Sequence, residues 1–376
     1  MYRNTYAEVD LSSIAHNIQV IKSVLSADTK IMAVVKADAY GHGIVPVSKA
    51  ALRAGATWLA IALPEEAIPL VEEKISCPIL VMGRSNNSQK MLAVTLGLRQ
   101  CVSDASEIQE LAQIAQEQKT HAFVHVKVDT GMGRIGVRST IEFMHMIEAF
   151  RSNDSVIFDG IFTHFACSDD MDKCFTHEQN DLFKKYVDIA RKNGFSPLAH
   201  ASSSAASIDL PEMQYGAIRL GISMYGYYPS CHVCRELVGL KPAMQVYTEI
   251  CHLKDIKKGD PVGYGSTWKA QKKTTVATLP IGYGDGYNRL LSNRGQAIVI
   301  AGGKPYMVPV IGRVCMDQIM VDVTGIPARL GDRVIAMGSV DGKNVDADEI
   351  ARICETISYE ILLSYTARVP RVYVGA

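Results

Sequence analysis

The sequence predicts an α/β protein: an N-terminal (β/α)8 TIM-like barrel followed by a mostly antiparallel β domain. Eight short apolar runs, bounded by Gly, Pro, Asp or Ser, alternate with amphipathic helical stretches over about 225 residues. From about Leu240 the pattern changes to strands joined by Gly-rich turns. The length of 376 residues suits two domains better than one.

The eight runs have the β-branched and aromatic composition of buried parallel strands. They occupy residues 31–36, 58–63, 78–82, 99–103, 121–128, 159–165, 196–201 and 217–222. Between them, residues 11–25 carry apolar side chains at helical spacing. Asp104 is the expected N-cap of a second helix, and the helix over 175–194 should end at Gly194. An open doubly wound sheet is the alternative, but eight units of this size favour closure.

The change of pattern sets the expected domain boundaries. The barrel is placed at residues 10–238 and the β domain at 239–376, with a strand in residues 1–9 joining the β domain. Within the β domain, only residues 346–355 show a helical pattern.

Composition excludes several classes of protein. The chain has 39 basic and 39 acidic residues, so it has no general attraction to nucleic acid or to anionic lipid, and neither is expected as a partner. No apolar run approaches the roughly 18 residues of a membrane span, and the N-terminus lacks the apolar segment of a signal peptide. Nine cysteines, an odd number, suit reduced thiols in the cytoplasm.

Candidate catalytic residues are sought at the C-terminal ends of the barrel strands, where such barrels place their active sites. Lys36 ends the first apolar strand and opens into a polar loop. Lysine prefers the surface, and one held at a barrel mouth is a candidate for Schiff-base formation. The alternative is an ordinary lysine whose ammonium reaches solvent at a strand end.

Hydroxyl and peptide N–H groups follow the last two strands, in residues 202–204 and 219–222. Loops at these positions of a barrel commonly bind phosphate. A serine cluster alone is usually a capped turn. Combined with Lys36 at the same mouth, however, it suggests pyridoxal 5′-phosphate as cofactor.

Three weaker motifs point elsewhere. Gly131, Gly133 and Gly136 match a dinucleotide fingerprint, although at the fifth strand instead of the first. A CxxC pair at residues 231–234 lacks a second pair with zinc-ligand spacing, so no metal site is expected. His125, which alternates with His121 along one strand, is expected to face solvent or a packing helix.

Eight motifs, in order along nearly the whole chain, resemble those of bacterial alanine racemase. They are VVKADAYGHG (34–43), KVDTGMGRIGV (127–137), THFACSD (163–169), IRLGISMYG (218–226), VGYGSTW (262–268), LPIGYGDGY (279–287), GRVCMDQ (312–318) and RVPRVYV (368–374). The resemblance implies interconversion of L-alanine and D-alanine, which supplies D-alanine for peptidoglycan, with pyridoxal phosphate in a cytoplasmic homodimer.

The resemblance also implies roles for individual residues. Lys36 would hold the cofactor covalently and act as one catalytic base, and Tyr264 of the second subunit would be the opposite base. Inversion needs a base on each face of the α-carbon. His164, between Arg219 and Tyr264 in the family, would relay positive charge toward the phenolate. Arg219 would contact the pyridine nitrogen and leave it unprotonated, because a guanidinium keeps its proton.

The anionic groups would have their own binding residues. These would be Tyr40, Ser204 and the backbone N–H groups of Gly221 and Ile222 for the phosphate, and Arg134 and the backbone N–H of Met316 for the substrate carboxylate. Lys127 matches a position that is often carbamylated in the family, where the carbamate would orient Arg134.

Two positions depart from the family pattern. Ser203 replaces a frequent asparagine, and Ala367 replaces a tyrosine that some members place just before RVPR. Tyr365, two residues earlier, could take the place of that tyrosine if the loop shifts. Loss of the large ring beside the methyl pocket would admit a hydroxymethyl group, so we expect a serine racemase side activity.

Three other functions compete with racemisation. A decarboxylase of basic amino acids shares the architecture, but it needs a free substrate carboxylate and an acidic partner for the pyridine nitrogen, which Arg134 and Arg219 do not provide. A non-catalytic carrier of pyridoxal phosphate would not need the β domain. A dinucleotide oxidoreductase depends on the glycine fingerprint alone.

Overall fold

The computed structural model describes residues 3–375, which form two compact units. The barrel unit comprises residues 13–39 and 44–241. The second unit comprises the described residues up to Ser12, the short segment 40–43, and the chain from Pro242 onward. Within residues 3–375, no helix combines the length and the apolar character needed to cross a bilayer.

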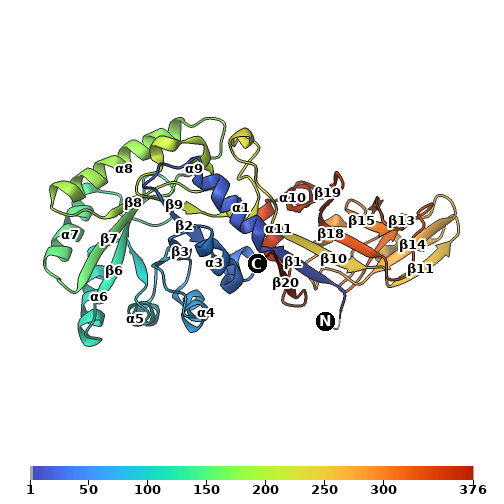
Figure 1. Cartoon of the computed structure of the whole chain (residues 1–376), viewed down its shortest axis with the longest axis horizontal. Helices are drawn as coiled ribbons and strands as arrows, with labels where there is room; N and C mark the ends of the chain where they lie inside the picture. Colours follow the sequence, from blue (N-terminus) through green and yellow to red (C-terminus); the bar gives the residue numbers. More distant parts are fainter. Residues whose placement is uncertain (1–2, 376) are drawn as a thin grey trace. The chain divides into compact units, whose positions relative to one another are not determined.

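The barrel unit confirms the predicted fold class. Eight strands form a closed barrel in sequence order, and each pairs in parallel with its neighbours (Figure 1). The strands are β2 (Lys30–Val34), β3 (Trp58–Ile61), β4 (Ile79–Val81), β5 (Arg99–Val102), β6 (Ala122–Lys127), β7 (Val156–Phe162), β8 (Leu198–His200) and β9 (Ala217–Leu220). Strands β3 and β4 are buried along their whole length, as their continuous apolar runs predict, and β9 is buried as well although it contains Arg219.

Helix α1 (Leu11–Lys22) precedes the first barrel strand, and further helices connect successive strands. The connecting helices are α3 (Ile44–Arg53), α4 (Ile68–Glu72), α5 (Asn87–Thr95), α6 (Ala105–Glu117), α7 (Thr140–Arg151), α8 (Cys174–Lys192) and α9 (Ser204–Asp209). Asp104 caps α6 by accepting a hydrogen bond from the Glu107 N–H, as predicted. Gly194 follows α8 with a φ of +88°, the left-handed geometry that ends many helices.

The second unit is mostly antiparallel β structure. Its main sheet has the order β16-β15-β18-β10-β1-β20, with β19 paired to β18, and two smaller sheets have the orders β11-β14-β17 and β12-β13. The N-terminal strand β1 lies between two strands of the C-terminal part, antiparallel to β10 and parallel to β20. Its Ala7 and Val9 are fully buried in that sheet.

The strands of this unit are defined as follows. They are β1 (Tyr6–Asp10), β10 (Met244–Glu249), β11 (His252–Ile256), β12 (Pro261–Val262), β13 (Trp268–Lys269), β14 (Thr274–Leu279), β15 (Gln296–Ala301), β16 (Lys304–Pro309), β17 (Ile319–Asp322), β18 (Arg333–Val340), β19 (Lys343–Val345) and β20 (Arg371–Val374).

The expectation of a single helix in this part of the chain was wrong. The predicted helix forms as α10 (Ala347–Cys354), and a second helix, α11 (Ser358–Ser364), follows it. The run of β-branched, aromatic and leucine residues around α11 resembles a strand. Ile361 and Leu362 nevertheless lie on the buried side of this short helix, so tertiary packing overrides the local preference.

Candidate active site

Lys36 lies two residues after the end of strand β2, at the C-terminal end of the barrel. The next four residues, 37–40, all have φ between +52° and +54°, so the segment α2 (Lys36–Tyr40) is a left-handed turn. Glu66 accepts a hydrogen bond from the Ala37 N–H at 2.5 Å, and the Asp38 carboxylate accepts one from the Ile44 N–H at 2.7 Å. These two carboxylates hold the turn and fix where Lys36 leaves the strand.

The surroundings of Lys36 favour its neutral amine. Burial, followed by the positive charges of Arg134 and Arg219, lowers the pKa of Lys36, and the Glu66 carboxylate opposes this shift in part. A lysine with a lowered pKa is a better nucleophile and a better base near neutral pH. The half-buried Lys36 therefore has the properties that the sequence predicts for a Schiff-base lysine.

Arg219, on β9, donates hydrogen bonds from both terminal nitrogens of its guanidinium group. Its guanidinium donates to the carbonyl oxygens of Thr163 at 2.8 Å and Ala201 at 2.7 Å, and to the Nδ1 atoms of His200 at 2.7 Å and His164 at 3.1 Å. The side chain is only 4% exposed, and burial lowers its pKa to about 9. Arg219 therefore remains charged at neutral pH, in one fixed orientation.

The structure brings His164 and Arg219 together, as the resemblance implies. Burial, followed by the Arg219 charge, lowers the pKa of His164 well below its usual value, so the imidazole is neutral. Because Arg219 can only donate, the Nδ1 of His164 accepts and its Nε2 carries the proton.

Three histidines, the fully buried His125 and His200 and the half-buried His164, are expected to make the fold sensitive to acid. Burial is the largest cause of the lowered pKa of each. In the unfolded chain, these three imidazoles take up protons near pH 6.5, whereas in the folded barrel they stay neutral at that pH. The free energy of unfolding should therefore fall as the pH drops below about 6.5, by up to about 1.4 kcal/mol per pH unit for each histidine.

Urea unfolding of the chain at pH 7.5 and 5.5 tests this expectation. Replacement of the exposed His232 by glutamine should leave the pH dependence unchanged. Equal stability at the two pH values would contradict the neutral assignment of the three imidazoles.

The loops after β8 and β9 form the expected hydroxyl and N–H cluster. The Ser204 hydroxyl, at the start of α9, accepts hydrogen bonds from the backbone N–H groups of Gly221 at 3.1 Å and Ser223 at 3.3 Å. Ser204 and Ile222 are buried beside this contact. A phosphate oxygen could replace the hydroxyl as acceptor for these N–H groups, so the donor set fits the predicted phosphate site.

Arg134 lies in an exposed loop between β6 and α7 that is shaped by Asp129. The Asp129 carboxylate accepts hydrogen bonds from the N–H groups of Gly131 at 3.1 Å and Gly133 at 2.9 Å. A Cβ at Gly136 would lie 2.6 Å from the Asp129 nitrogen, so glycine is required there by close backbone contact. Because Asp129 already occupies two of the fingerprint N–H groups, this loop is not arranged to hold a pyrophosphate.

Lys127 ends β6 inside the barrel, with Nζ 4.6 Å from the ring centre of Phe162. Burial, then the Arg219 charge, lowers the pKa of Lys127 well below its usual value. A neutral amine is the form that can add carbon dioxide, so the environment of Lys127 is compatible with the carbamate that the resemblance implies.

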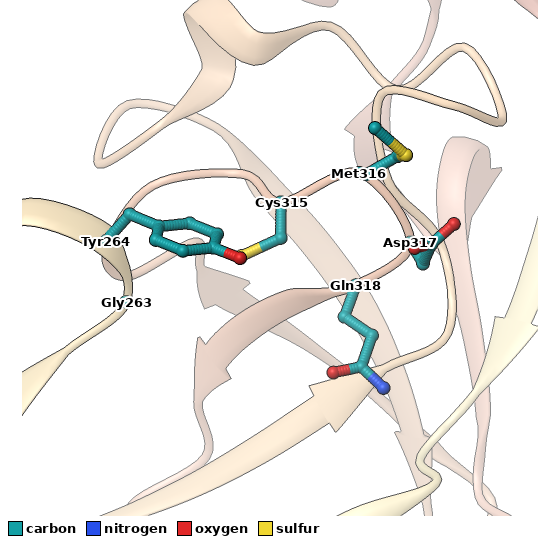
Figure 2. A pocket seen from close by; sticks show the side chains of 6 residues that line it. All are labelled: Gly263, Tyr264, Cys315, Met316, Asp317 and Gln318. Carbon is teal, nitrogen blue, oxygen red and sulfur yellow. The ribbon is translucent and has the colours of Figure 1, made fainter.

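Tyr264 and Met316 lie in the second unit, where they line one pocket of about 510 Å³. Gly263, Cys315, Asp317 and Gln318 complete its lining (Figure 2). Tyr264 is 71% exposed, and Met316 is 53% exposed. A Cβ at Gly282 would lie 2.4 Å from the carbonyl oxygen of Met316, so this glycine allows the close packing that fixes the Met316 backbone.

Tyr40 belongs to the same unit, within the segment 40–43. Its ring packs against Tyr359 with ring centres 5.9 Å apart, and burial raises its pKa to about 12. The hydroxyl of Tyr40 therefore stays protonated and can donate a hydrogen bond to an anion. Arg371 holds the segment by donating to the Gly41 carbonyl at 2.8 Å.

No three His, Cys, Asp or Glu side chains in residues 3–375 are grouped as metal ligands. All nine cysteines are free thiols, and Cys234 of the CxxC pair donates its thiol hydrogen to Glu236 at 3.3 Å.

The sequence missed the polar residues inside the barrel. His125 does not face solvent or a helix, as we expected. It is fully buried, with its Nδ1 atom 2.8 Å from Nε2 of His200 and its Nε2 atom 3.3 Å from Asp159. Glu66, which holds the turn after Lys36, was also missed, because contacts between separate loops leave no local signal in a sequence.

Comparison with known families gives the same result in both parts of the chain. The family model described as "Alanine racemase, N-terminal domain" matches residues 9–229, and "Alanine racemase, C-terminal domain" matches residues 243–373. The chain is 42% identical over 373 residues to an alanine racemase of Halothermothrix orenii and 40% identical over 374 residues to alanine racemase 1 of Clostridium acetobutylicum. These alignments cover 99% of this chain, and 97% and 96% of the two relatives.

Solved structures agree with this result. An alanine racemase from Clostridium difficile 630 matches with a TM-score of 0.93 at 35% identity, covering 100% of this chain and 96% of the other. The Bacillus anthracis enzyme with bound L-Ala-P matches with a TM-score of 0.93 at 34% identity, covering 100% and 97%. A histidine racemase from Leuconostoc mesenteroides matches with a TM-score of 0.90 at 27% identity, covering 99% and 98%.

These matches support the racemase prediction and not the decarboxylase alternative, because every relative and structure described above is a racemase. They extend over the barrel and the β domain in one continuous alignment. The chain belongs to the alanine racemase family.

Proposed function

We propose that this protein interconverts L-alanine and D-alanine with pyridoxal phosphate as cofactor. The observation that carries the proposal is Lys36, a half-buried lysine with a lowered pKa at the barrel mouth, in a chain that matches alanine racemases over its full length. Members of this family depend on pyridoxal phosphate. The D-alanine formed would serve peptidoglycan synthesis, and the odd number of free cysteines favours the cytoplasm as the compartment.

The residues present fit this cofactor. Its aldehyde matches the amine of Lys36, whose pKa is lowered by burial. Its phosphate matches the Ser204 hydroxyl and the N–H of Gly221, which are hydrogen-bonded to each other in this structure. We propose that the cofactor is held by Lys36, Tyr40, His164, Ser204, Arg219, Gly221 and Ile222. When bound, pyridoxal phosphate supplies an electron-accepting ring that makes the α-proton of an attached amino acid removable.

Arg219 would determine the electronic state of that ring. Its guanidinium donates hydrogen bonds to carbonyl oxygens and imidazoles and keeps its proton near pH 7. A pyridine nitrogen that faces Arg219 accepts a hydrogen bond but receives no proton. The ring is then a weaker electron acceptor than one paired with a carboxylate, which disfavours side reactions such as transamination.

The inversion itself would need two bases. We propose that Lys36 removes or delivers the proton on one face of the α-carbon and that Tyr264 does so on the other, with Tyr264 contributed by the second subunit of a homodimer. Arg134 and the backbone N–H of Met316 would bind the substrate carboxylate. The exposure of Tyr264 and Met316 in a pocket of the β domain leaves both accessible to a partner subunit.

The test of the proposed function uses the purified chain with pyridoxal phosphate and L-alanine in D₂O. The expected product is D-alanine with deuterium at the α-carbon, detected by chiral chromatography and mass spectrometry. A parallel assay with L-histidine tests whether the chain acts on the amino acid named for the related histidine racemase. A second parallel assay with L-lysine tests the decarboxylase alternative. Release of carbon dioxide from lysine without inversion of alanine would contradict the proposal.

We also expect measurable racemisation of serine. Ala367 is exposed and small, while Tyr365 is 4% exposed and its carbonyl accepts a hydrogen bond from Arg371 at 2.7 Å. Tyr365 is therefore not at the exposed position that Ala367 occupies. The expected ratio of kcat/KM for serine over alanine is above ~10⁻⁴, and it should fall in the variant Ala367→Tyr. A ratio already below this value in the unmodified chain would rule out the side activity.

A further inference from the structure

A continuous line of hydrogen bonds leads from Arg219 to a carboxylate inside the barrel. Arg219 lies 2.7 Å from Nδ1 of His200, and Nε2 of His200 lies 2.8 Å from Nδ1 of His125. Nε2 of His125 lies 3.3 Å from Oδ2 of Asp159. Arg219 and both histidines are buried, and Asp159 is half-buried. The proposed mechanism gives no role to His125, His200 or Asp159.

The chemistry of the two ends gives this line a direction. Arg219 can only donate, so Nδ1 of His200 accepts and its Nε2 carries the proton. His200 then donates to Nδ1 of His125, whose Nε2 carries the next proton and donates to the Asp159 carboxylate. Each histidine has one tautomer, and the line runs from a positive guanidinium to a negative carboxylate.

The backbone of β7 places Asp159 in this position. Val124 of β6 pairs with Phe158, and the next residue, His125, pairs with Gly160, so Asp159 is an extra residue in β7. Such a β-bulge turns a side chain away from the regular alternation of the strand. The next residue is glycine, and a Cβ at Gly160 would lie 2.3 Å from the His125 ring. The strand therefore supplies both the carboxylate and the space for the imidazole.

The charges around the line make Asp159 its only anion. Arg99 and Arg219 both disfavour a charged His125, while Asp159 favours it, and burial, the largest influence, keeps the pKa of His125 low. His200 faces burial, Arg219, His125 and Lys127, all of which lower its pKa. Two neutral imidazoles can transmit the influence of the carboxylate by polarising successive hydrogen bonds.

We propose that Asp159 is a positioning residue for the active site, which acts through His125 and His200 to fix the orientation and the charge of the Arg219 guanidinium. Its consequence for catalysis rests on the proposed function, in which Arg219 meets the pyridine nitrogen. Its consequence for the strength of the two imidazole hydrogen bonds does not. The competing explanation is that Asp159 only pairs with Arg99, whose Nε atom lies 3.3 Å away, and thereby stabilises the barrel.

The experiment compares the full chain, loaded with pyridoxal phosphate, with its Asp159→Asn variant. Asparagine keeps the size and an oxygen that accepts from His125, but it loses the charge, so Arg219 still sets the direction of the line while the polarisation by the carboxylate is lost. We expect kcat to fall roughly tenfold, the difference between a charge-assisted and a neutral hydrogen bond, with KM for alanine within about twofold. NMR of labelled imidazoles should show Nε2–H tautomers for His125 and His200 in both proteins, and both Nε2–H protons should shift upfield in the variant because their hydrogen bonds are weaker.

Two further variants separate positioning from stability. Arg99→Gln removes the ion pair but leaves the Asp159 charge to His125, so the imidazole protons should keep the shifts of the unmodified chain and kcat should not fall. Asp181→Asn removes an exposed pair with Lys184 at the same distance of 3.3 Å and should change neither readout.

Parallel losses of kcat and melting temperature in Asp159→Asn and Arg99→Gln, with unshifted imidazole protons in both, would overturn the proposal. So would unshifted imidazole protons and an unchanged kcat in Asp159→Asn. If the unmodified chain did not racemise alanine, the proposed function would fail, while the shifts of the imidazole protons would still decide the role of Asp159.

Discussion

The Lys36→Ala variant is expected to lose at least roughly 10⁴-fold in kcat/KM for alanine racemisation. The substitution removes both the proposed attachment point of the cofactor and one of the two proposed bases. Glu66 and Asp38 hold the turn after β2, so the alanine would stay where Lys36 stood and offer no amine. The measurement is the initial rate of D-alanine formation with saturating pyridoxal phosphate.

Three additional measurements make the Lys36 result specific. Borohydride reduction should fix the cofactor to the unmodified chain, with the added mass on the peptide that contains Lys36, and should not fix it to the variant. Added methylamine should restore part of the lost activity. Lys184→Ala, which removes an exposed lysine of α8, should behave like the unmodified chain. Activity of Lys36→Ala within about a hundredfold of the original would show that another group is the base.

The second large effect is expected for Tyr264→Phe. Loss of one general base should lower racemisation by about 10² to 10⁴-fold in both directions. The remaining base can still remove and return a proton on its own face. In D₂O, the variant should therefore exchange the α-hydrogen of one alanine enantiomer without inverting it, while the other enantiomer keeps its hydrogen.

Proton NMR of the α-position, combined with chiral chromatography, measures exchange and inversion separately. Tyr306→Phe, in strand β16 of the same unit, is the matched control and should racemise normally. Equal exchange of both enantiomers by Tyr264→Phe would contradict the assignment of Tyr264 as the second base.

The parts of this protein that the sequence predicts are those encoded by local patterns. The eight barrel strands are short, mostly apolar runs, and the N-cap Asp104 and Gly194 after α8 mark the ends of helices by their own chemistry. Lys36 was found because a charged residue at the end of an apolar strand is unusual. The motifs then led from these positions to the family.

The features that the sequence did not predict depend on contacts between distant segments. The bulge at Asp159 follows from the register between β6 and β7, which no single strand reveals. The burial of His125 follows from that register, because alternation along β6 alone does not say which face is the interior of the barrel. The left-handed turn at residues 37–40 contains only one residue type, aspartate, that favours such geometry, and it depends on Glu66 from another loop.

This turn also determines which mutations the site can accept. A left-handed helical residue with a side chain is disfavoured by roughly 1–2 kcal/mol, and glycine avoids most of that cost. In an ordinary helix, glycine is among the most damaging substitutions. At Ala37 and Ala39 the order is reversed, because glycine there relieves the backbone and loses only a methyl group. At Asp38 and Tyr40 glycine would also remove the hydrogen bond to the Ile44 N–H and the contact with the Tyr359 ring, so these two side chains offset the strain of their own backbone.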